Sequence, residues 1–182
     1  MQTKRTGRAK YIMIQNTALG RATLLLALFL LGPLVMIVQA KGAEKQPLTP
    51  KKWSFPLAST QFRISDAYGE RTDPFTGEDT VHRGVDLACA EGTPVQAARE
   101  GTVTVARRST TYGNYLCILH PGGQETIYAH LQYLYVRAGE VVQAGQCIGT
   151  VGQTGRATGA HLHFELLEQG ARIDPSGVLG LP

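Results

Sequence analysis

The hydrophobic and polar positions divide this chain of 182 residues into two unequal parts. Residues 22–38 form an almost unbroken apolar run. Because no polar residues interrupt the run to give it an amphipathic face, a buried core helix of a globular domain is a poor explanation for it. Within residues 1–40 there are basic but no acidic side chains; the basic ones are Lys4, Arg5, Arg8, Lys10 and Arg21. A basic leader followed by an apolar run is typical of a segment that directs export across a membrane.

Residues 1–40 are therefore expected to form either a cleaved signal peptide or an N-terminal membrane anchor. The small-residue pattern Val38-Gln39-Ala40 and the helix-breaking pair Gly32-Pro33 favour cleavage near Ala40, whereas the basic leader is long for a signal peptide. If the segment is retained, residues 22–38 tether the protein to the inner membrane, near the lower limit of about 17–25 residues for a span. Both alternatives predict a periplasmic or extracellular domain.

The remainder of the chain has the short hydrophobic runs of a β protein. Residues 41–52 combine charge and proline without apolar periodicity, which predicts a linker, and one folded domain is expected over residues 53–182. Runs rich in Val, Ile, Thr and Tyr predict strands at 101–106, 115–120, 126–130, 146–151 and 161–166. The turn residues 121–124 predict a hairpin, and no stretch of 12 residues after Trp53 has a helical period, with 94–99 the only ambiguous segment. The expected fold class is all-β, mainly antiparallel.

Charge and cysteine content narrow the classes of function. The formal net charge of +4 arises in the leader, because residues 41–182 hold 13 basic and 14 acidic side chains. Without a cluster of Lys and Arg in the domain, nucleic acid is not expected as a partner. The spacing of Cys89, Cys117 and Cys147 matches no metal-binding motif. We expect each cysteine to be a small buried apolar residue in a strand, and a disulfide between Cys117 and Cys147 is an alternative that the sequence does not decide.

Histidines and one aspartate supply the candidate chemistry. His82 and Asp86 are four residues apart with Gly84 between them, and a glycine there lets the backbone turn so that both side chains can point at one divalent ion. Because side chains alternate along a strand, His161 and His163 are expected on one face. Two polar residues on a solvated strand face would also explain this pair taken alone.

A catalytic zinc ion takes three protein ligands and keeps one position open for water. His82, Asp86 and one of the pair His161 and His163 satisfy that count. The other member of the pair and His130 then remain for proton transfer, for which imidazoles with a pKa near neutrality are suited. Tyr128 is expected on the same strand face as His130. There is no H-E-x-x-H motif, which excludes the helical metalloprotease site with a glutamate base.

These motifs occur in an order that resembles the lysostaphin-type, or LytM-like, zinc endopeptidases of bacteria. The resemblance covers about residues 66–175, and each landmark is weak alone whereas the ordered set is specific. The landmarks are Tyr68-Gly-Glu-Arg71 with Pro74-Phe-Thr-Gly77, His82-Arg-Gly-Val-Asp86, Gly92-Thr-Pro-Val95, Tyr112-Gly-Asn114, Tyr128-Ala-His-Leu131, Gly145-Gln-Cys-Ile-Gly149 and Thr158-Gly-Ala-His-Leu-His-Phe-Glu165.

The resemblance implies a role for each candidate residue. His82, Asp86 and His163 would ligate one zinc ion per chain, and His130 and His161 would be the catalytic histidines. The implied activity is hydrolysis of peptide cross-links in bacterial peptidoglycan, within an open substrate groove. Family members cleave D-alanyl cross-links to diaminopimelate or glycine bridges, and residues 71–77 look more like the former group.

Two other functions share this sequence pattern. One is a non-catalytic activator or binding module for other wall hydrolases, which would have no reason to keep the ligand set whole. The other is a peptidase subunit of an envelope-spanning secretion or conjugation machine.

Five further residues have weaker assignments: Arg71 as a substrate-carboxylate contact or a surface ion pair, Glu165 as a partner of an imidazole or a solvated strand end, His120 as structural, and Tyr68 and Asn114 as lining the groove.

Overall fold

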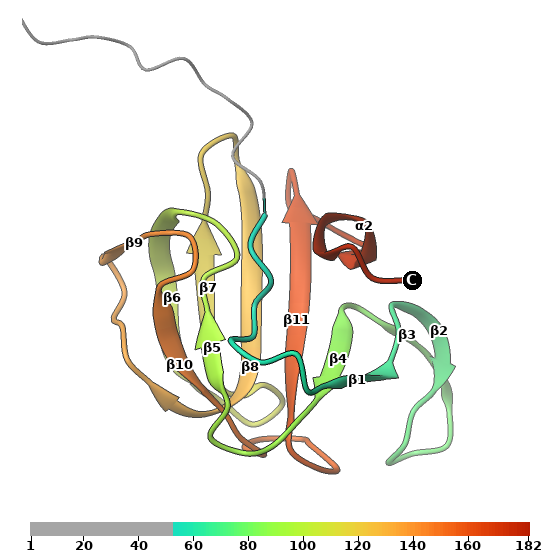
Figure 1. Ribbon diagram of the computed structural model, residues 1–182. Helices are drawn as coiled ribbons and strands as arrows, with labels where there is room; N and C mark the ends of the chain where they lie inside the picture. Colours follow the sequence, from blue (N-terminus) through green and yellow to red (C-terminus); the bar gives the residue numbers. More distant parts are fainter. Residues whose placement is uncertain (1–52) are drawn as a thin grey trace, which may run out of the picture. The chain divides into compact units, whose positions relative to one another are not determined.

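The computed structural model describes residues 53–182, and these residues are built almost entirely from β-strands (Figure 1). The strands are β1 (Arg63–Asp66), β2 (Gly69–Thr72), β3 (Asp79–His82), β4 (Val85–Ala88), β5 (Pro94–Gln96), β6 (Gly101–Ser109), β7 (Gly113–Leu119), β8 (Gln124–Leu134), β9 (Val141–Val142), β10 (Cys147–Val151), β11 (His161–Glu168) and β12 (Ala171–Ile173). Within 53–182 the only helix is α2 (Ser176–Leu179). The expected all-β class is confirmed.

The main sheet has ten strands, with the order β1-β4-β11-β8-β7-β6-β9 and antiparallel pairing throughout. β10 pairs with the C-terminal end of β8 and with β5, and β12 pairs with β11. β2 and β3 form a separate hairpin beside the sheet. The 11-residue strand β8 therefore pairs with three strands, β11, β7 and β10. Its neighbour β11 pairs in turn with β4 and β12.

All five predicted strand segments lie in strands to within one residue, and the predicted turn at 121–124 joins β7 to β8. That turn is closed by backbone hydrogen bonds between His120 and Gln124 and between Gly123 and His120. The ambiguous segment 94–99 forms strand β5 and then bends, with no helix. The strands that were not predicted have two to four residues each, which is too short to show an alternating pattern.

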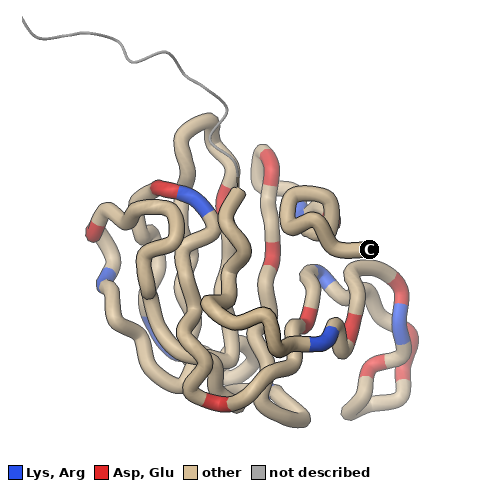
Figure 2. Tube along the Cα trace, viewed as in Figure 1, with Lys and Arg blue, Asp and Glu red and all other residues tan. Residues whose placement is uncertain are grey.

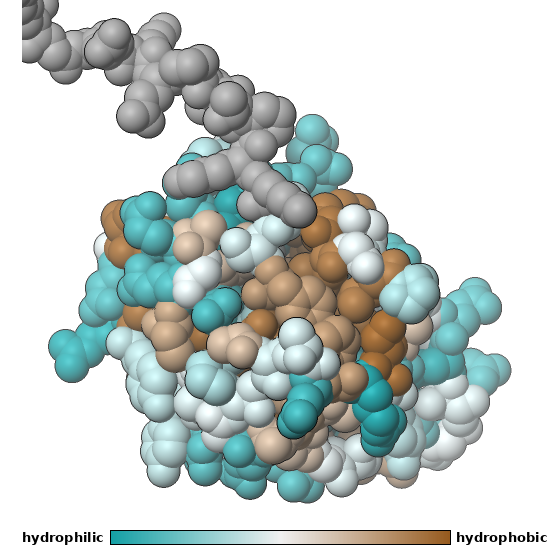
Figure 3. Space-filling view, in the orientation of Figure 1, coloured by the Kyte–Doolittle hydropathy of each residue, from teal (hydrophilic) through white to brown (hydrophobic). Residues whose placement is uncertain are grey.

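One face of the sheet carries the main hydrophobic core. Tyr128 of β8 and Phe164 of β11 are fully buried there, with ring centroids 5.3 Å apart, and Leu162 lies on the same face. The segment 53–62 runs across this face and packs Trp53, Phe55 and Phe62 against the core (Figure 1). Figure 3 shows apolar surface between this segment and α2. Charged residues of both signs are scattered along the chain (Figure 2).

The cysteines differ from the expectation in two cases. Cys117 is buried in β7, as predicted, but Cys147 is exposed and Cys89 is half-buried outside a strand. All three are free, and the Cys117–Cys147 disulfide is not formed. The proposed leader, apolar segment and linker, residues 1–52, lie outside the described residues. Among residues 53–182 no helix is long and apolar enough to cross a membrane.

Candidate metal and catalytic site

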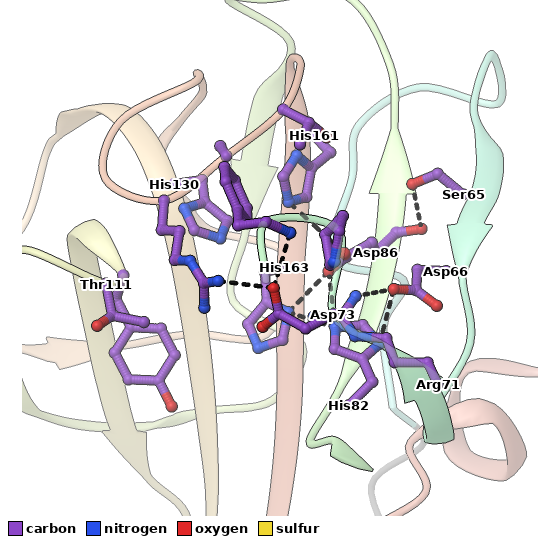
Figure 4. A pocket seen from close by; sticks show the side chains of 16 residues that line it. Ser65, Asp66, Arg71, Asp73, His82, Asp86, Thr111, His130, His161 and His163 are labelled. Atoms are coloured by element: carbon purple, nitrogen blue, oxygen red, sulfur yellow. Dashed lines mark hydrogen bonds and ion pairs between the residues drawn. The ribbon is translucent and has the colours of Figure 1, made fainter. Parts of the chain in front are cut away.

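Three metal-ligating side chains meet at the junction of β3, β4 and β11. His82 ends β3, Asp86 lies in β4, and the register of the β4–β11 pair places Asp86 directly opposite His163. One donor atom from each of these buried residues lies within 4.8 Å of the other two. Figure 4 shows the three side chains pointing into one cavity.

The candidate ligand atoms lie within hydrogen-bonding distance of one another. His82 Nε2 lies 3.2 Å from Asp86 Oδ1 and 3.1 Å from His163 Nδ1, and Asp86 Oδ1 lies 2.7 Å from His163 Nδ1. The far side of each ring has an acceptor, because His82 Nδ1 donates to the Ala67 carbonyl at 2.8 Å and His163 Nε2 donates to Glu165 Oε1 at 3.1 Å. Both imidazoles therefore turn their second ring nitrogen toward the Asp86 carboxylate, where a bound metal ion would take the place of a proton.

This donor set fits a single zinc ion. Zinc binds nitrogen and oxygen at about 2.0–2.1 Å, and neighbouring ligands of a tetrahedral ion then lie about 3.3 Å apart. Burial alone would lower the pKa of His163, but hydrogen bonds with Asp86 and Glu165 raise it to about 9. Burial would raise the pKa of Asp86, but hydrogen bonds from His163 and His82 hold it well below its usual range. The cluster thus attracts positive charge, which a metal ion supplies by displacing the proton.

Gly84, between the two residues of the His82–Asp86 motif, is required by close packing. A Cβ atom at this position would lie 2.4 Å from the Phe164 carbonyl oxygen and 3.0 Å from His163 Cε1. The backbone of Gly84 has no positive φ, so the reason is its approach to β11 rather than the backbone freedom that the sequence suggested. A side chain here would push β4 away from β11 and separate Asp86 from His163.

His130 and His161 lie on the other side of the cavity, with ring centroids 4.6 Å apart. His161 Nδ1 donates to the Gly159 carbonyl and His130 Nδ1 donates to the Thr154 carbonyl, both at 2.8 Å. These hydrogen bonds fix each ring through Nδ1 and leave Nε2 without a bond to the two carbonyls. His161 Nε2 is 3.7 Å from Asp86 Oδ2. Burial lowers the pKa of His130 to about 4, which keeps this imidazole neutral at pH 7.

The expectation that Tyr128 shares a face with His130 is wrong. Tyr128 is buried in the core and its hydroxyl accepts a hydrogen bond from the Ala98 backbone, whereas His130 lines the cavity. His130 has φ of 62°, a left-handed conformation that interrupts the alternation of β8. This backbone torsion rotates the imidazole out of the core and toward His161. Residues held in such conformations cluster at functional sites.

The cavity has a volume of about 280 Å³ and is walled by two loops. One loop joins β2 to β3 and carries Asp73 and Phe75; the other joins β10 to β11 and carries Arg156. Arg71 also lines the cavity, and its guanidinium is paired with Asp66. Of the two roles expected for Arg71, a substrate contact or a surface ion pair, the structure shows the ion pair.

Tyr68 and Asn114, expected to line the groove, do not line this cavity. The Tyr68 hydroxyl donates to the Arg172 carbonyl, and the Asn114 side-chain amide donates to the carbonyls of Leu131 and Gln132. Tyr68 therefore fastens the loop between β1 and β2 to β12, and Asn114 fastens β7 to β8.

Glu165 is buried with 1% of its surface exposed, which excludes a solvated strand end. Besides the contact with His163, its carboxylate accepts hydrogen bonds from the Tyr112 hydroxyl at 2.6 Å and from Arg172 Nε at 2.7 Å. Tyr112 lies in a recognised motif, but no pattern in the sequence pointed to Arg172. These residues hold the ring of His163 in place.

His120 is structural, as expected, and lies outside the cavity. Its Nδ1 donates to the Glu100 carbonyl at 2.8 Å, and its Nε2 lies 2.7 Å from the hydroxyl of Thr126. Trp53 packs edge-on against the ring, with centroids 5.4 Å apart.

The fold and the site together define the class of lysostaphin-type metallopeptidases. The model of peptidase family M23 matches residues 80–175, more than half of the chain, and the chain belongs to this family. The match includes the five residues His82, Asp86, His130, His161 and His163.

Curated relatives carry peptidase names. The chain is 42% identical over 123 residues to the DD-carboxypeptidase/endopeptidase Mpg of Neisseria meningitidis serogroup B, covering 68% of this chain and 28% of that protein. It is 43% identical over 117 residues to the peptidoglycan DD-endopeptidase ShyC of Vibrio cholerae, covering 64% of this chain and 27% of that protein. The chain thus spans less than a third of the length of these relatives.

Solved structures show the same fold. A zinc-containing peptidase from Vibrio cholerae superposes with a TM-score of 0.64 at 35% identity, covering 72% of this chain and 41% of that one. The catalytic domain of lysostaphin from Staphylococcus simulans superposes with a TM-score of 0.60 at 32% identity, covering 65% of this chain and 92% of that domain.

Proposed function

We propose that this protein is a zinc-dependent endopeptidase that hydrolyses D-alanyl-diaminopimelate cross-links in bacterial peptidoglycan. The observation that carries the proposal is the meeting of a three-donor cluster, His82, Asp86 and His163, with two cavity-facing imidazoles, His130 and His161. Membership of family M23 supports peptidase chemistry. The names of the relatives from Neisseria and Vibrio support peptidoglycan stem peptides as the substrate.

In this proposal, His82, Asp86 and His163 hold the zinc ion. Zinc at such a site polarises the scissile carbonyl and lowers the pKa of water to about 7. His130, neutral because it is buried, offers the lone pair of Nε2 to a proton of the attacking water. His161 orients the attacking water through Nε2 and shares with His130 the transfer of a proton to the leaving amine. The Thr154 and Gly159 carbonyls prevent either ring from turning its N–H into the cavity.

A peptidase explains the site better than a wall-binding module or an activator of other hydrolases. Binding alone needs neither three convergent ligands nor the left-handed backbone that directs His130 at His161. The hydrogen bonds behind His82, His130, His161 and His163 also orient every ring, a requirement of metal binding and proton transfer.

We further propose that the domain acts outside the inner membrane. The basic leader and the apolar residues 22–38 support export, and cleavage near Ala40 would release the domain. A reporter enzyme fused after Pro182 should be active in the periplasm or medium. Activity confined to the cytoplasm would contradict this location.

The activity is tested with the purified full chain after chelation and after reloading with one equivalent of zinc. Zinc should restore cleavage of wall material cross-linked through D-alanine and diaminopimelate, with products identified by mass spectrometry. Glycine-bridged walls serve as the second substrate. His161→Ala, which spares the three ligands, should bind zinc and lose turnover. Undiminished hydrolysis by metal-free protein would refute the proposal.

A further inference from the structure

An ion pair joins the two walls of the cavity. Arg156 Nη2, from the loop between β10 and β11, lies 2.6 Å from Asp73 Oδ1, from the loop between β2 and β3. The guanidinium also stacks on the ring of Phe75, with its central carbon 4.4 Å from the ring centroid. Asp73 is seen in Figure 4 with this contact drawn as a dashed line. A planar cation is thus held on an aromatic platform at the edge of the catalytic cavity.

Two arginines line this cavity, and they differ in availability. Arg71 is paired with Asp66, and its side chain is 27% exposed. Arg156 is 39% exposed, and its partner Asp73 does not depend on it, because Asp73 Oδ1 also accepts hydrogen bonds from the backbone of Phe75 and Thr76. Because the Arg156 side chain is more than a third exposed, this ion pair contributes little to stability. Arg156 can therefore exchange Asp73 for another carboxylate without disrupting the turn.

We propose that Arg156 is a specificity-determining residue that binds the free carboxylate next to the scissile bond of the substrate. The inference rests on the proposed peptidase function and names the feature of the substrate that is recognised. In a D-alanyl-diaminopimelate cross-link the carbon beside the scissile nitrogen carries a free carboxylate. An internal glycine of a glycine bridge carries none. Arg156 therefore selects the first chemistry over the second.

The charges around the cavity support this role. Asp66, Asp73 and Asp86 all line it, so an anionic substrate group needs a cation beyond the zinc ion. A guanidinium offers two parallel N–H groups that match a carboxylate, and the ring of Phe75 supports it where both residues line the cavity. In the free protein Asp73 occupies the place of the substrate carboxylate, which keeps the guanidinium oriented before the substrate arrives.

The test compares two substrates for the full chain loaded with zinc. One is the cross-linked dimer with the free carboxylate, and the other is the same dimer with that group converted to a primary amide. Wild-type protein should favour the acid by about 10- to 100-fold in kcat/KM, the effect of one charge-assisted contact. Arg156→Gln should bring this ratio to within about threefold of unity. Arg137→Gln, an exposed arginine outside the cavity, should keep the wild-type ratio.

The ratio does not depend on the fraction of folded enzyme, so a loss of stability in Arg156→Gln cannot imitate the result. Asp73→Asn keeps the oxygen that accepts the two backbone hydrogen bonds and removes the competing charge. This variant should lower KM for the acid and preserve the preference. An Arg156→Gln variant with the wild-type ratio would overturn the proposal, since Arg156 would then only hold the loop.

A binding measurement separates this proposal from the proposed function. N-acetyl-D-alanyl-D-alanine and its C-terminal amide carry the same two groups beside an amide bond, and their affinity for the zinc-loaded protein is measured by NMR titration. Wild-type protein should prefer the acid, and Arg156→Gln should not. Failure to cleave either dimer, with this preference intact, would count against the peptidase function alone. Equal or undetectable binding of acid and amide by the wild type would overturn the role of Arg156.

Discussion

Glu165 accepts a hydrogen bond from His163, whose Nε2 lies 3.1 Å from Oε1, and the two residues are separated by one residue on β11. The alternation of the strand places both side chains on the face opposite Phe164, which is in the core. His163 therefore has a carboxylate behind it and Asp86 in front of it. This arrangement selects the tautomer that directs Nδ1 toward the metal cluster.

Glu165→Gln should weaken zinc binding by about 10- to 100-fold, because the neutral amide accepts the same hydrogen bond without supporting the ring with negative charge. The affinity is measured by competition with a chromogenic chelator. Glu168→Gln, an exposed carboxylate on the same strand, is the matched control and should bind zinc as the wild type does. Equal affinities for all three proteins would show that Glu165 only neutralises Arg172.

Exchange of the histidines for alanine should separate binding from turnover. His163→Ala removes one of three ligands and should weaken zinc binding by at least about 100-fold, more than the loss of a hydrogen-bonded neighbour. His130→Ala should retain zinc with near wild-type affinity and lose about 100- to 10,000-fold in kcat, as for a missing general acid or base. Metal content by mass spectrometry and kcat are measured on the same samples. Equal loss of zinc from both variants would make His130 a ligand.

Much of the fold could be predicted because its longer strands carry strong local patterns. The runs at 115–120 and 161–166 are rich in apolar and β-branched residues, and they lie, to within one residue, in strands of seven and eight residues. The strands β4 and β5 were not predicted, since three or four residues cannot show a period. Pairing with longer strands, rather than local propensity, makes these short segments extended.

The site was predictable where spacing reports geometry and not where distant segments meet. His161 and His163 share a face because strand alternation is regular. The orientation of His130 depends on one backbone torsion, which local composition does not reveal. The contact of Arg172 with Glu165 depends on the pairing of β12 with β11, and no motif indicated it.

The loop that carries Arg156 depends on Gly155, which has φ of 73° and no room for a side chain. A Cβ atom there would lie 2.2 Å from the Gly113 nitrogen and 2.6 Å from the Thr111 carbonyl oxygen. Gly155→Ala should therefore lose about 1–3 kcal/mol in free energy of unfolding and reduce turnover, because the neighbouring Thr154 carbonyl orients His130. Chemical denaturation measures the first effect.

Gly159→Ala is the control in the same loop, since a Cβ atom there meets nothing within 4 Å and the backbone has no positive φ. Its free energy of unfolding should stay within about 0.5 kcal/mol of the wild type. If Gly155→Ala were as stable as Gly159→Ala, the close approach of this loop to Gly113 would not constrain the site.

The pH dependence of stability should report the buried imidazole of His120. Burial, and to a lesser extent the positive charge of Arg99, lowers the pKa of His120 below its ordinary value of 6.5. As the pH falls below 6.5 the unfolded chain binds a proton that the folded protein does not accept, so the free energy of unfolding decreases until the lowered pKa is reached. His120→Gln should be less stable at pH 7.5 but should lose this component, which is at most about 1.4 kcal/mol per pH unit for one proton. Denaturation of both metal-free proteins between pH 7.5 and 5.5 isolates this component, because the two proteins differ only at residue 120. Parallel stability curves would show that His120 takes up its proton equally in the folded and unfolded states.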